Sequence, residues 1–443
     1  MFVATAFLIV SYVATVVFRN IFLGGMPFWY DPARDLTLAG DMFSKFSFLG
    51  QPSGIPGFFY PPYWLWLLFS LLRVSRDPAV VTFLAITLPY LIFFPLGLWL
   101  LRNALSKTGV FLVLAVFVTN FDNYFTQLWN LNLAPLILLW IIVAYDRKKY
   151  LFLGIFTGLL LCFDFAIGIP VAICTLLFSK FNYRFLLGNL LIFTPTILFE
   201  LKNKFALTRV LLPSVFSKVV SSSGLTKIEI IKYFIPGAAT LALLIIGRKV
   251  TRTSGFVISL ILATAVVYLR NANPIWTYHF IGLETLYLLL FCILAKDLLN
   301  RFSKPFSFLV IGFLIIKLFV LVASPDNILN FDNLTTKKQI TEFVLKDNLQ
   351  KTCGLAFYSR TAFERNYEYE YLFNLYSKKL NLPALMINSN QKNCVYVIFP
   401  RVSENQLESY LNSVTEVGKF GTLWKKEFSS GLTVVFRERH ERI

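Results

Sequence analysis

The chain has 443 residues, of which 56% are hydrophobic, 17% aromatic and only 15% charged. Its mean hydropathy of +0.65 excludes an ordinary water-soluble protein, because such a chain would expose more apolar surface than water tolerates. The formal net charge of +18 does not indicate a nucleic-acid partner, since the basic residues form short clusters between hydrophobic runs. Composition therefore predicts a polytopic α-helical protein whose partners include membrane lipids.

Hydrophobic runs that approach the roughly 20 residues of a membrane-crossing helix recur as far as residue 323. We expect about eleven transmembrane helices, near residues 1–23, 79–101, 109–121, 131–145, 151–163, 165–178, 185–199, 229–247, 254–269, 276–295 and 306–323. No basic segment precedes the first run, so we interpret it as a retained helix rather than a signal peptide. Residues 61–72 are shorter and rich in aromatic side chains, which predicts an interfacial helix.

Lysine and arginine cluster in alternate short loops. The basic loops are residues 102–107, 147–149, 180–184, 248–252 and 296–304. By contrast, residues 119–132 contain no Lys or Arg, and the bend at Asp164, which we interpret as a turn residue, carries only a carboxylate. The positive-inside rule places the basic loops in the cytoplasm. We therefore expect a plasma-membrane protein with a cytoplasmic N-terminus, an external first loop and an external C-terminal region.

The composition changes after about residue 324, where charges become frequent and apolar runs shorten. The pattern predicts helices and strands in the order helix 335–348, strand 353–358, helix 366–380, strand 394–399, helix 403–412 and final strands near 418–437. We expect a transmembrane domain, residues 1–324, followed by a small extracytoplasmic α/β domain, residues 325–443. Cys353 and Cys394 each precede a predicted strand, and they are either disulfide partners or two free thiols.

The predicted external loops contain both carboxylates and cations. A carboxylate can act as general base for an attacking hydroxyl or amine, and basic side chains can neutralise a phosphate leaving group. The catalytic candidates are Asp31, Asp35 and Asp122. The phosphate-binding candidates are Arg270, Lys202, Arg34 and His279. The aromatic candidates for lining the substrate site are Tyr30, Tyr60, Tyr63 and Trp64.

Two short motifs carry a family resemblance. Asp31-Pro-Ala-Arg-Asp35 follows the first hydrophobic run, and Tyr60-Pro-Pro-Tyr-Trp64 opens the short aromatic helix. Together with the span pattern over roughly residues 1–325, they resemble the C-type glycosyltransferases, in the branch of dolichyl-phosphate-mannose protein mannosyltransferases and lipid A aminoarabinose transferases. That family carries an Asp-Glu-Ala-Arg-Tyr-like motif followed by His-Pro-Pro or Lys-Pro-Pro. Pro32, Asp35 and Tyr60 are therefore departures from its pattern.

The resemblance implies that Asp31 is the catalytic base and that Asp122 is the second acidic residue of the next external loop. It implies a membrane glycosyltransferase that takes a sugar from a polyprenyl-phosphate-linked donor. The acceptor is a protein, a lipid or a glycan. We expect no cofactor and no metal, since the Glu that the family places beside the base is replaced by Pro32, although three carboxylates would suit a divalent cation.

The same residues also fit structural roles. Asp31 and Asp122 are suited to capping helices, Arg270 and Lys202 to contacting lipid headgroups, and the tyrosines to anchoring the chain at the membrane interface. Two other functions stay open. One is a transporter or flippase of a lipid-linked or small polar substrate, and the other is a noncatalytic membrane anchor for the C-terminal domain.

Overall fold

A computed structural model describes residues 2–216, 225–235, 250–270, 275–323, 333–348, 354–357, 367–381, 386–387, 394–400, 420–428 and 432–439. By its contacts the chain divides into two compact units. Unit 1 comprises Met1–Val16, Asp41–Val74 and Val81–Leu321; unit 2 comprises Val17–Gly40, Ser75–Val80 and Val322–Ile443. The sequence predicts one boundary, near residue 324. The contacts instead group Val17–Gly40, the segment that carries Asp31, with the C-terminal region.

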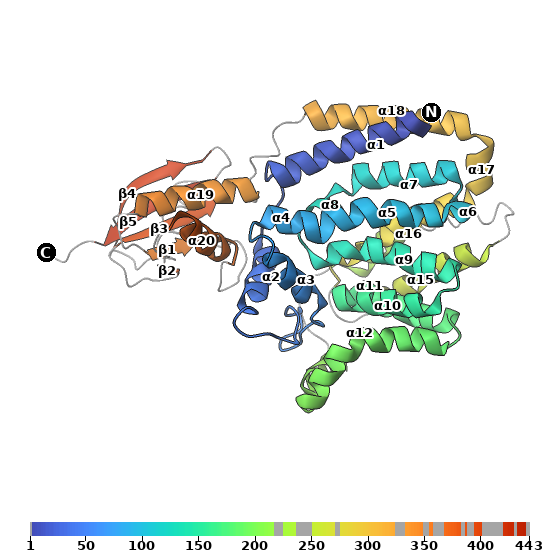
Figure 1. Cartoon of the computed structure of the whole chain (residues 1–443), viewed down its shortest axis with the longest axis horizontal. Helices are drawn as coiled ribbons and strands as arrows, with labels where there is room; N and C mark the ends of the chain where they lie inside the picture. The colour runs from blue at the N-terminus through green and yellow to red at the C-terminus, as the bar shows by residue number, and fades with distance from the viewer. Residues whose placement is uncertain are drawn as a thin grey trace. The chain divides into compact units, whose positions relative to one another are not determined.

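Unit 1 is helical. Its longer helices are α1 (Phe2–Val17), α3 (Tyr63–Leu72), α5 (Leu88–Leu100), α7 (Lys107–Asn120), α9 (Ala134–Asp146), α10 (Tyr150–Phe163), α11 (Phe165–Phe178), α12 (Tyr183–Lys202), α13 (Ala206–Phe216), α15 (Arg252–Arg270), α16 (Leu283–Leu294) and α18 (Ser303–Ala323). Short helical pieces complete it: η2 (Phe83–Thr87), α6 (Arg102–Leu105), α8 (Asp122–Thr126), η3 (Asn130–Leu133), residues 227–235, η4 (Thr277–Phe280) and α17 (Lys296–Arg301). Figure 1 shows α5, α7, α9 and α10 side by side with nearly parallel axes.

Several of these helices suit a membrane. Within the described residues, six are long and apolar enough to cross one: Val3–Phe22, Pro78–Leu100, Tyr183–Lys202, Arg252–Arg270, Thr277–Leu294 and Ser303–Ala323. Shorter apolar helices cover the predicted spans 109–121, 131–145, 151–163 and 165–178. Part of the remaining predicted span, 229–247, lies outside the described residues. The structure is thus that of a helical membrane protein, while the number of eleven spans stays a prediction.

The basic loops meet at one end of unit 1. Arg147 and Lys296 donate hydrogen bonds of 2.6 and 2.5 Å to backbone carbonyls within residues 100–103. The guanidinium of Arg252, at the start of α15, lies 4.5 Å from the ring centre of Tyr145, at the end of α9. Loops that are far apart in sequence and share a basic character therefore share one end of the helix bundle.

The opposite end of the bundle gathers aromatic and acidic side chains. The Tyr124 hydroxyl lies 3.5 Å from a carboxylate oxygen of Glu284, and the rings of Trp129 and Tyr278 meet edge to face at 5.6 Å. These contacts bring the loop between α7 and α9 against the start of α16. We call this the carboxylate end, after three of the acidic residues that it carries: Asp122, Asp164 and Glu284.

In unit 2 the segment after α1 pairs with the beginning of the C-terminal region. Backbone amides of residues 334–335, at the start of α19 (Leu334–Asp347), donate to carbonyls within residues 24–26 at 3.0 and 3.1 Å. Lys337 on α19 donates a 2.5 Å hydrogen bond to the carbonyl of Phe28. The chain then enters α2 (Tyr30–Asp41) directly. The C-terminal region thereby fixes the start of the helix that carries Asp31.

The rest of unit 2 is a five-stranded sheet with helices. The strands are β1 (Gly354–Phe357), β2 (Met386–Ile387), β3 (Cys394–Pro400), β4 (Phe420–Glu427) and β5 (Leu432–Arg439), in the order β2-β1-β3-β5-β4. β1 is parallel to both of its neighbours, whereas β5 is antiparallel to β3 and β4. The predicted helix 403–412 lies outside the described residues, and β2 was not predicted.

Aromatic rings form the core between α19 and this sheet. Trp424 stacks on Phe436 at 5.6 Å and meets Phe343 of α19 edge to face at 5.7 Å, while Tyr396 is fully buried. Cys394 is disulfide-bonded; Cys353, the partner that the sequence offers, lies outside the described residues. The cysteines of the apolar helices, Cys162, Cys174 and Cys292, are free and buried.

Candidate functional site

Helix α2 carries the first motif on its opening turns. Asp31 lies in the first turn, where a carboxylate interacts favourably with the positive end of the helix dipole. Pro32 is tolerated there because the first-turn amides lack an intrahelical partner. Residues 31, 34 and 35 follow at the one-turn spacing that places side chains on a common face.

The three charged side chains of this turn form one ion-pair cluster. The Arg34 guanidinium donates to Asp35 at 2.7 and 2.8 Å, and it lies 2.9 Å from Asp31. The Asp35 side chain is 1% exposed, whereas that of Asp31 is 32% exposed. The structure therefore brings three predicted site residues together, with Asp35 buried beneath Arg34 and Asp31 partly exposed.

Burial and charge act in opposite directions on Arg34. Burial lowers the pKa of its guanidinium, but the nearby carboxylates of Asp35 and Asp31 raise it, and the net shift of the pKa is upward. Arg34 therefore stays a cation that is already bound to two carboxylates. Its described hydrogen-bond and ion-pair partners are Asp31 and Asp35, and its predicted role as a phosphate ligand would require it to share its donors.

An aromatic wall adjoins this cluster within unit 2. Tyr30, which precedes Asp31, meets Tyr367 edge to face at 5.2 Å, and Tyr367 begins α20 (Tyr367–Leu380). Phe28 is fully buried and lies 6.2 Å from Tyr371 on the same helix. Figure 1 shows α20 in the C-terminal part of the chain. The first turn of α20 thus belongs to the surroundings of Asp31.

The second motif lies in unit 1 and holds a hairpin against the bundle. Tyr60 stacks on Phe165, the first residue of α11, with the ring centres 5.0 Å apart. Trp64 is fully buried and meets Phe163 edge to face, while the Tyr63 hydroxyl donates to a carbonyl of α12 at 2.7 Å. Of these aromatic candidates, Tyr60 and Tyr63 keep part of their surface exposed.

Gly50 explains how this hairpin closes. The amide of Gly50 donates to the carbonyl of Tyr60, and the amide of Tyr60 donates to the carbonyl of Gln51. A Cβ atom at residue 50 would lie 2.4 Å from the Pro61 carbonyl oxygen and 2.6 Å from that of Tyr60. Only glycine lets the two strands of the turn approach so closely.

Asp164 occupies the bend between α10 and α11. One of its carboxylate oxygens accepts hydrogen bonds from the amides of Ala166 and Ile167, which caps α11. The other oxygen is buried and has no hydrogen-bond partner among the described residues. Burial raises the pKa of Asp164 to about 7, although the two amides act to lower it. The predicted turn residue is therefore also a buried acid whose charge state changes near neutral pH.

The remaining predicted residues are distributed over the ends of several helices. Asp122 begins α8 and is half-buried, Lys202 ends α12 and Arg270 ends α15, both exposed. His279 lies in η4, where its Nδ1 accepts a hydrogen bond from the amide of Trp276 at 3.1 Å. Within the described part of the chain, no hydrogen bond or ion pair joins Lys202 or Arg270 to a carboxylate.

Sequence reasoning missed Glu284. This residue lies in the first turn of α16, where Gly282, with φ of +94°, begins the helix. A Cβ atom at residue 282 would lie 2.7 Å from Leu138, so glycine is required both by conformation and by space. A carboxylate inside the apolar run 276–295 was the available signal, because ionisable residues in such runs are usually functional. Glu284 lines a cavity of about 680 Å³.

Among the described residues, no group of three or more His, Cys, Asp and Glu side chains is placed to hold a metal ion. Comparison of the chain with protein-family models, with curated proteins and with solved structures finds no match. The function is therefore inferred from the geometry of the site.

Proposed function

We propose that the protein is an integral membrane glycosyltransferase that transfers a sugar from a polyprenyl-phosphate-linked donor to an acceptor at the outer face of the membrane. The observation that carries the proposal is the cluster at the start of α2. Asp31 is accessible, and Arg34 holds it in place through an ion pair of 2.9 Å while Arg34 itself is anchored on the buried Asp35. An accessible and oriented carboxylate is what a general base requires.

In the proposed reaction the Asp31 carboxylate takes the proton of an acceptor hydroxyl or amine. The freed oxygen or nitrogen lone pair attacks the anomeric carbon of the donor sugar. A new glycosidic bond forms as the bond between that carbon and the phosphate oxygen breaks, and polyprenyl phosphate leaves with the bond's electron pair. Arg270, Lys202 and His279 are the proposed phosphate ligands of unit 1, and Asp122 is the proposed second acid.

Two features support an external location of the chemistry. The disulfide at Cys394 is typical of an oxidising compartment outside the cytoplasm. The basic loops lie at the end of unit 1 that is opposite to the carboxylate end, which is the distribution that the positive-inside rule describes. We infer a cytoplasmic basic end, a cytoplasmic N-terminus and an external C-terminal region.

Replacement of the proposed base tests this function. Asp31→Asn keeps the shape of the side chain and removes its basicity, so we expect loss of sugar transfer by at least about 100-fold. The assay uses membranes that contain the full chain and a radiolabelled polyprenyl-phosphate sugar, with lipid and protein products measured separately. Asp41→Asn, at the exposed end of the same helix, is the matched control and should leave transfer unchanged. Full activity of a folded Asp31→Asn variant would refute the assignment.

One observation favours transport as the second candidate function. Asp164 is a buried carboxylate at a helix break with one unpaired oxygen, and such acids often mark ion or proton pathways in membrane proteins. A transporter predicts that Asp164→Asn abolishes movement of substrate across vesicles, whereas Asp31→Asn has no effect. If the protein is a glycosyltransferase, Asp31→Asn should lower sugar transfer more than Asp164→Asn does.

A further inference from the structure

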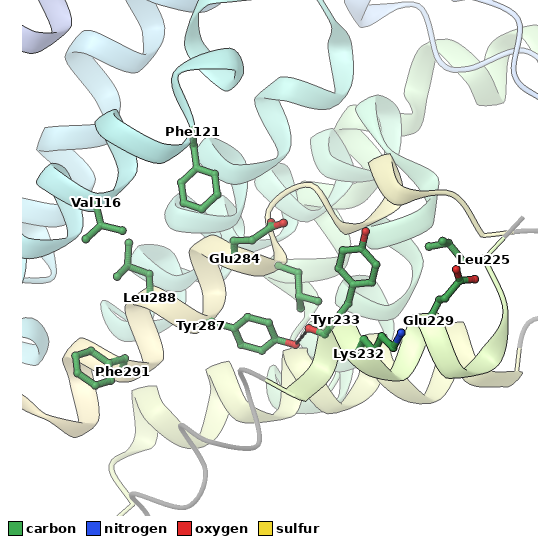
Figure 2. A pocket seen from close by; sticks show the side chains of 11 residues that line it. Val116, Phe121, Leu225, Glu229, Lys232, Tyr233, Glu284, Tyr287, Leu288 and Phe291 are labelled. Carbon is green, nitrogen blue, oxygen red and sulfur yellow. Dashed lines mark hydrogen bonds between the residues drawn. The ribbon is translucent and has the colours of Figure 1, made fainter. Parts of the chain in front are cut away.

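The cavity of unit 1 lies along one face of α16. Figure 2 shows side chains of α16 together with residues from the end of α7 and from the helical segment 227–235. Glu284, Tyr287, Leu288 and Phe291 follow one another at the three- and four-residue spacing of a single helix face. From Glu284 to Phe291 the helix rises about 10 Å. The cavity is therefore elongated, with an acid in the first turn of α16 and apolar side chains farther along it.

The polarity of the lining changes along this direction. Val116, Leu288 and Phe291 are grouped on one side of Glu284 in Figure 2, and Glu229 and Lys232 lie on the other. Glu229 and Lys232 are exposed, whereas Glu284 is half-buried. An apolar compartment that leads to a charged opening in a membrane protein matches the shape of an amphiphile with a hydrocarbon chain and a polar head.

Glu284 is the carboxylate of this lining that lacks a charge partner. Glu229 accepts hydrogen bonds from the amide and hydroxyl of Thr226 at 2.8 and 2.9 Å, which forms a capping box, and Lys232 is its neighbouring cation. Glu284 accepts from backbone amides at the start of its own helix and receives a 3.5 Å contact from the Tyr124 hydroxyl, but no described residue forms an ion pair with it. A half-buried acid without a counter-charge favours a cationic ligand.

Aromatic rings contact that acid or line the same cavity. Tyr124 stacks on Phe121 at 5.3 Å, and Tyr233 stacks on Phe280 at 4.1 Å. The Tyr287 hydroxyl donates to the backbone carbonyl of Tyr233 at 3.0 Å, which fixes the Tyr287 ring against the segment 227–235. Rigid aromatic rings beside a carboxylate are the combination that binds ammonium groups, through cation–π attraction and charge-assisted hydrogen bonds.

We propose that this cavity binds a bilayer lipid with an ammonium head group, with the ammonium at Glu284 and a hydrocarbon chain along Leu288 and Phe291. This proposal does not depend on the sugar-transfer chemistry proposed for Asp31. Its ligand class is an aminophospholipid or a choline phospholipid, as opposed to an anionic lipid that would be held by Lys232.

Lipid binding to the purified full-length protein tests the site. Native mass spectrometry in detergent compares phosphatidylethanolamine, phosphatidylcholine and phosphatidylglycerol with identical acyl chains. We expect the two ammonium lipids to bind about tenfold more tightly than phosphatidylglycerol, because both bring a positive charge to Glu284 and phosphatidylglycerol brings none. Free ethanolamine should not compete, because it lacks the chain that fills the apolar compartment. Equal binding of phosphatidylglycerol, or competition by ethanolamine, would overturn the proposal.

Four variants locate the ligand. Glu284→Gln should remove the preference for ammonium lipids, whereas Glu229→Gln, a second glutamate of the same lining whose replacement can keep the capping box, should preserve it. Leu288→Trp should weaken all three lipids by filling the apolar compartment. Lys232→Gln should leave the ammonium lipids bound.

Two results of this series count against the site. A preference that survives Glu284→Gln would refute the ammonium subsite, and loss of all binding in Lys232→Gln would assign the cavity to an anionic head group instead. If Glu284→Gln does not fold, Tyr124→Phe provides the second measurement, because it removes the hydroxyl that contacts Glu284 and keeps the ring and the charge. The preference for ammonium lipids should then persist or rise, and its disappearance would also refute the site.

Discussion

The charged turn of α2 and the carboxylate end of unit 1 place acids in opposite electrostatic situations. At α2, two carboxylates share the single guanidinium of Arg34, and the more buried of the two, Asp35, makes the shorter contact. At the carboxylate end, Glu284 and Asp164 have no ion-pair partner among the described residues. The first arrangement is stable on its own and leaves Asp31 accessible. The second leaves acids whose charge has to be met by a ligand or a proton.

Breaking the α2 cluster should have the largest effect on the protein. Arg34→Met leaves Asp35 buried without its cation, and removal of one partner of a buried ion pair costs about 3–5 kcal/mol. We expect a lower midpoint of thermal unfolding for the full protein in detergent, together with loss of sugar transfer because Asp31 loses its anchor.

The double variant separates these two effects. Arg34→Met combined with Asp35→Asn removes the unpaired charge and should recover most of the stability, but it should not recover transfer. A double variant as unstable as Arg34→Met alone would show that the guanidinium matters through packing rather than through its charge. A double variant with full transfer would show that Asp31 does not need its anchor.

Local pattern predicted much of the fold, because the helices and strands in question are periodic or strongly apolar. The predicted helix 366–380 corresponds to α20 at Tyr367–Leu380, and the predicted strand 394–399 to β3 at Cys394–Pro400. The pairing of residues 24–26 with 334–335 was not predictable. It consists of backbone hydrogen bonds, and such bonds between distant segments leave no signature in side-chain pattern.

The candidate site was predictable to a similar degree. The cluster of Asp31, Arg34 and Asp35 was visible because helical spacing puts these side chains on one face. That Asp35 is buried and Asp31 only half-buried depends on which side of α2 is packed, and α2 alone does not determine this. Glu284 was overlooked because no motif surrounds it, although a carboxylate inside an apolar run was a signal, and its importance rests on the contact with Tyr124 and the cavity that the fold creates.

The pH dependence of stability tests the buried carboxylate of Asp164, which has no ion-pair partner among the described residues. Its pKa is raised from the ordinary value of 3.8 to about 7 by burial, so between these values the folded protein holds a proton that the unfolded chain has lost. Stability should therefore fall as the pH rises from about 4 to about 7 and then level off.

Asp164→Asn can still cap α11 and carries no charge, so its stability should not fall between about pH 4 and about pH 7. At pH 8 the variant should be more stable than the parent, by a few kcal/mol at most. Thermal unfolding at pH 5 and pH 8 measures the difference. Asp41→Asn, at the exposed end of α2, should follow the parent at both values. A parent whose stability does not change over this range would contradict the buried-acid interpretation of Asp164.

The smallest effect is expected at the aromatic wall beside Asp31. Tyr367→Ala removes the edge-to-face partner of Tyr30, an interaction worth about 0.5–1.5 kcal/mol, whereas Tyr367→Phe keeps the ring and removes only the hydroxyl. If α20 positions the start of α2, kcat/KM for sugar transfer should fall by about threefold to tenfold in the alanine variant and change little in the phenylalanine variant. Equal losses in both would point instead to a contact of the hydroxyl with substrate. If neither variant loses activity, the C-terminal region does not contribute to the chemistry at Asp31. It would then be only a structural partner of residues 24–30.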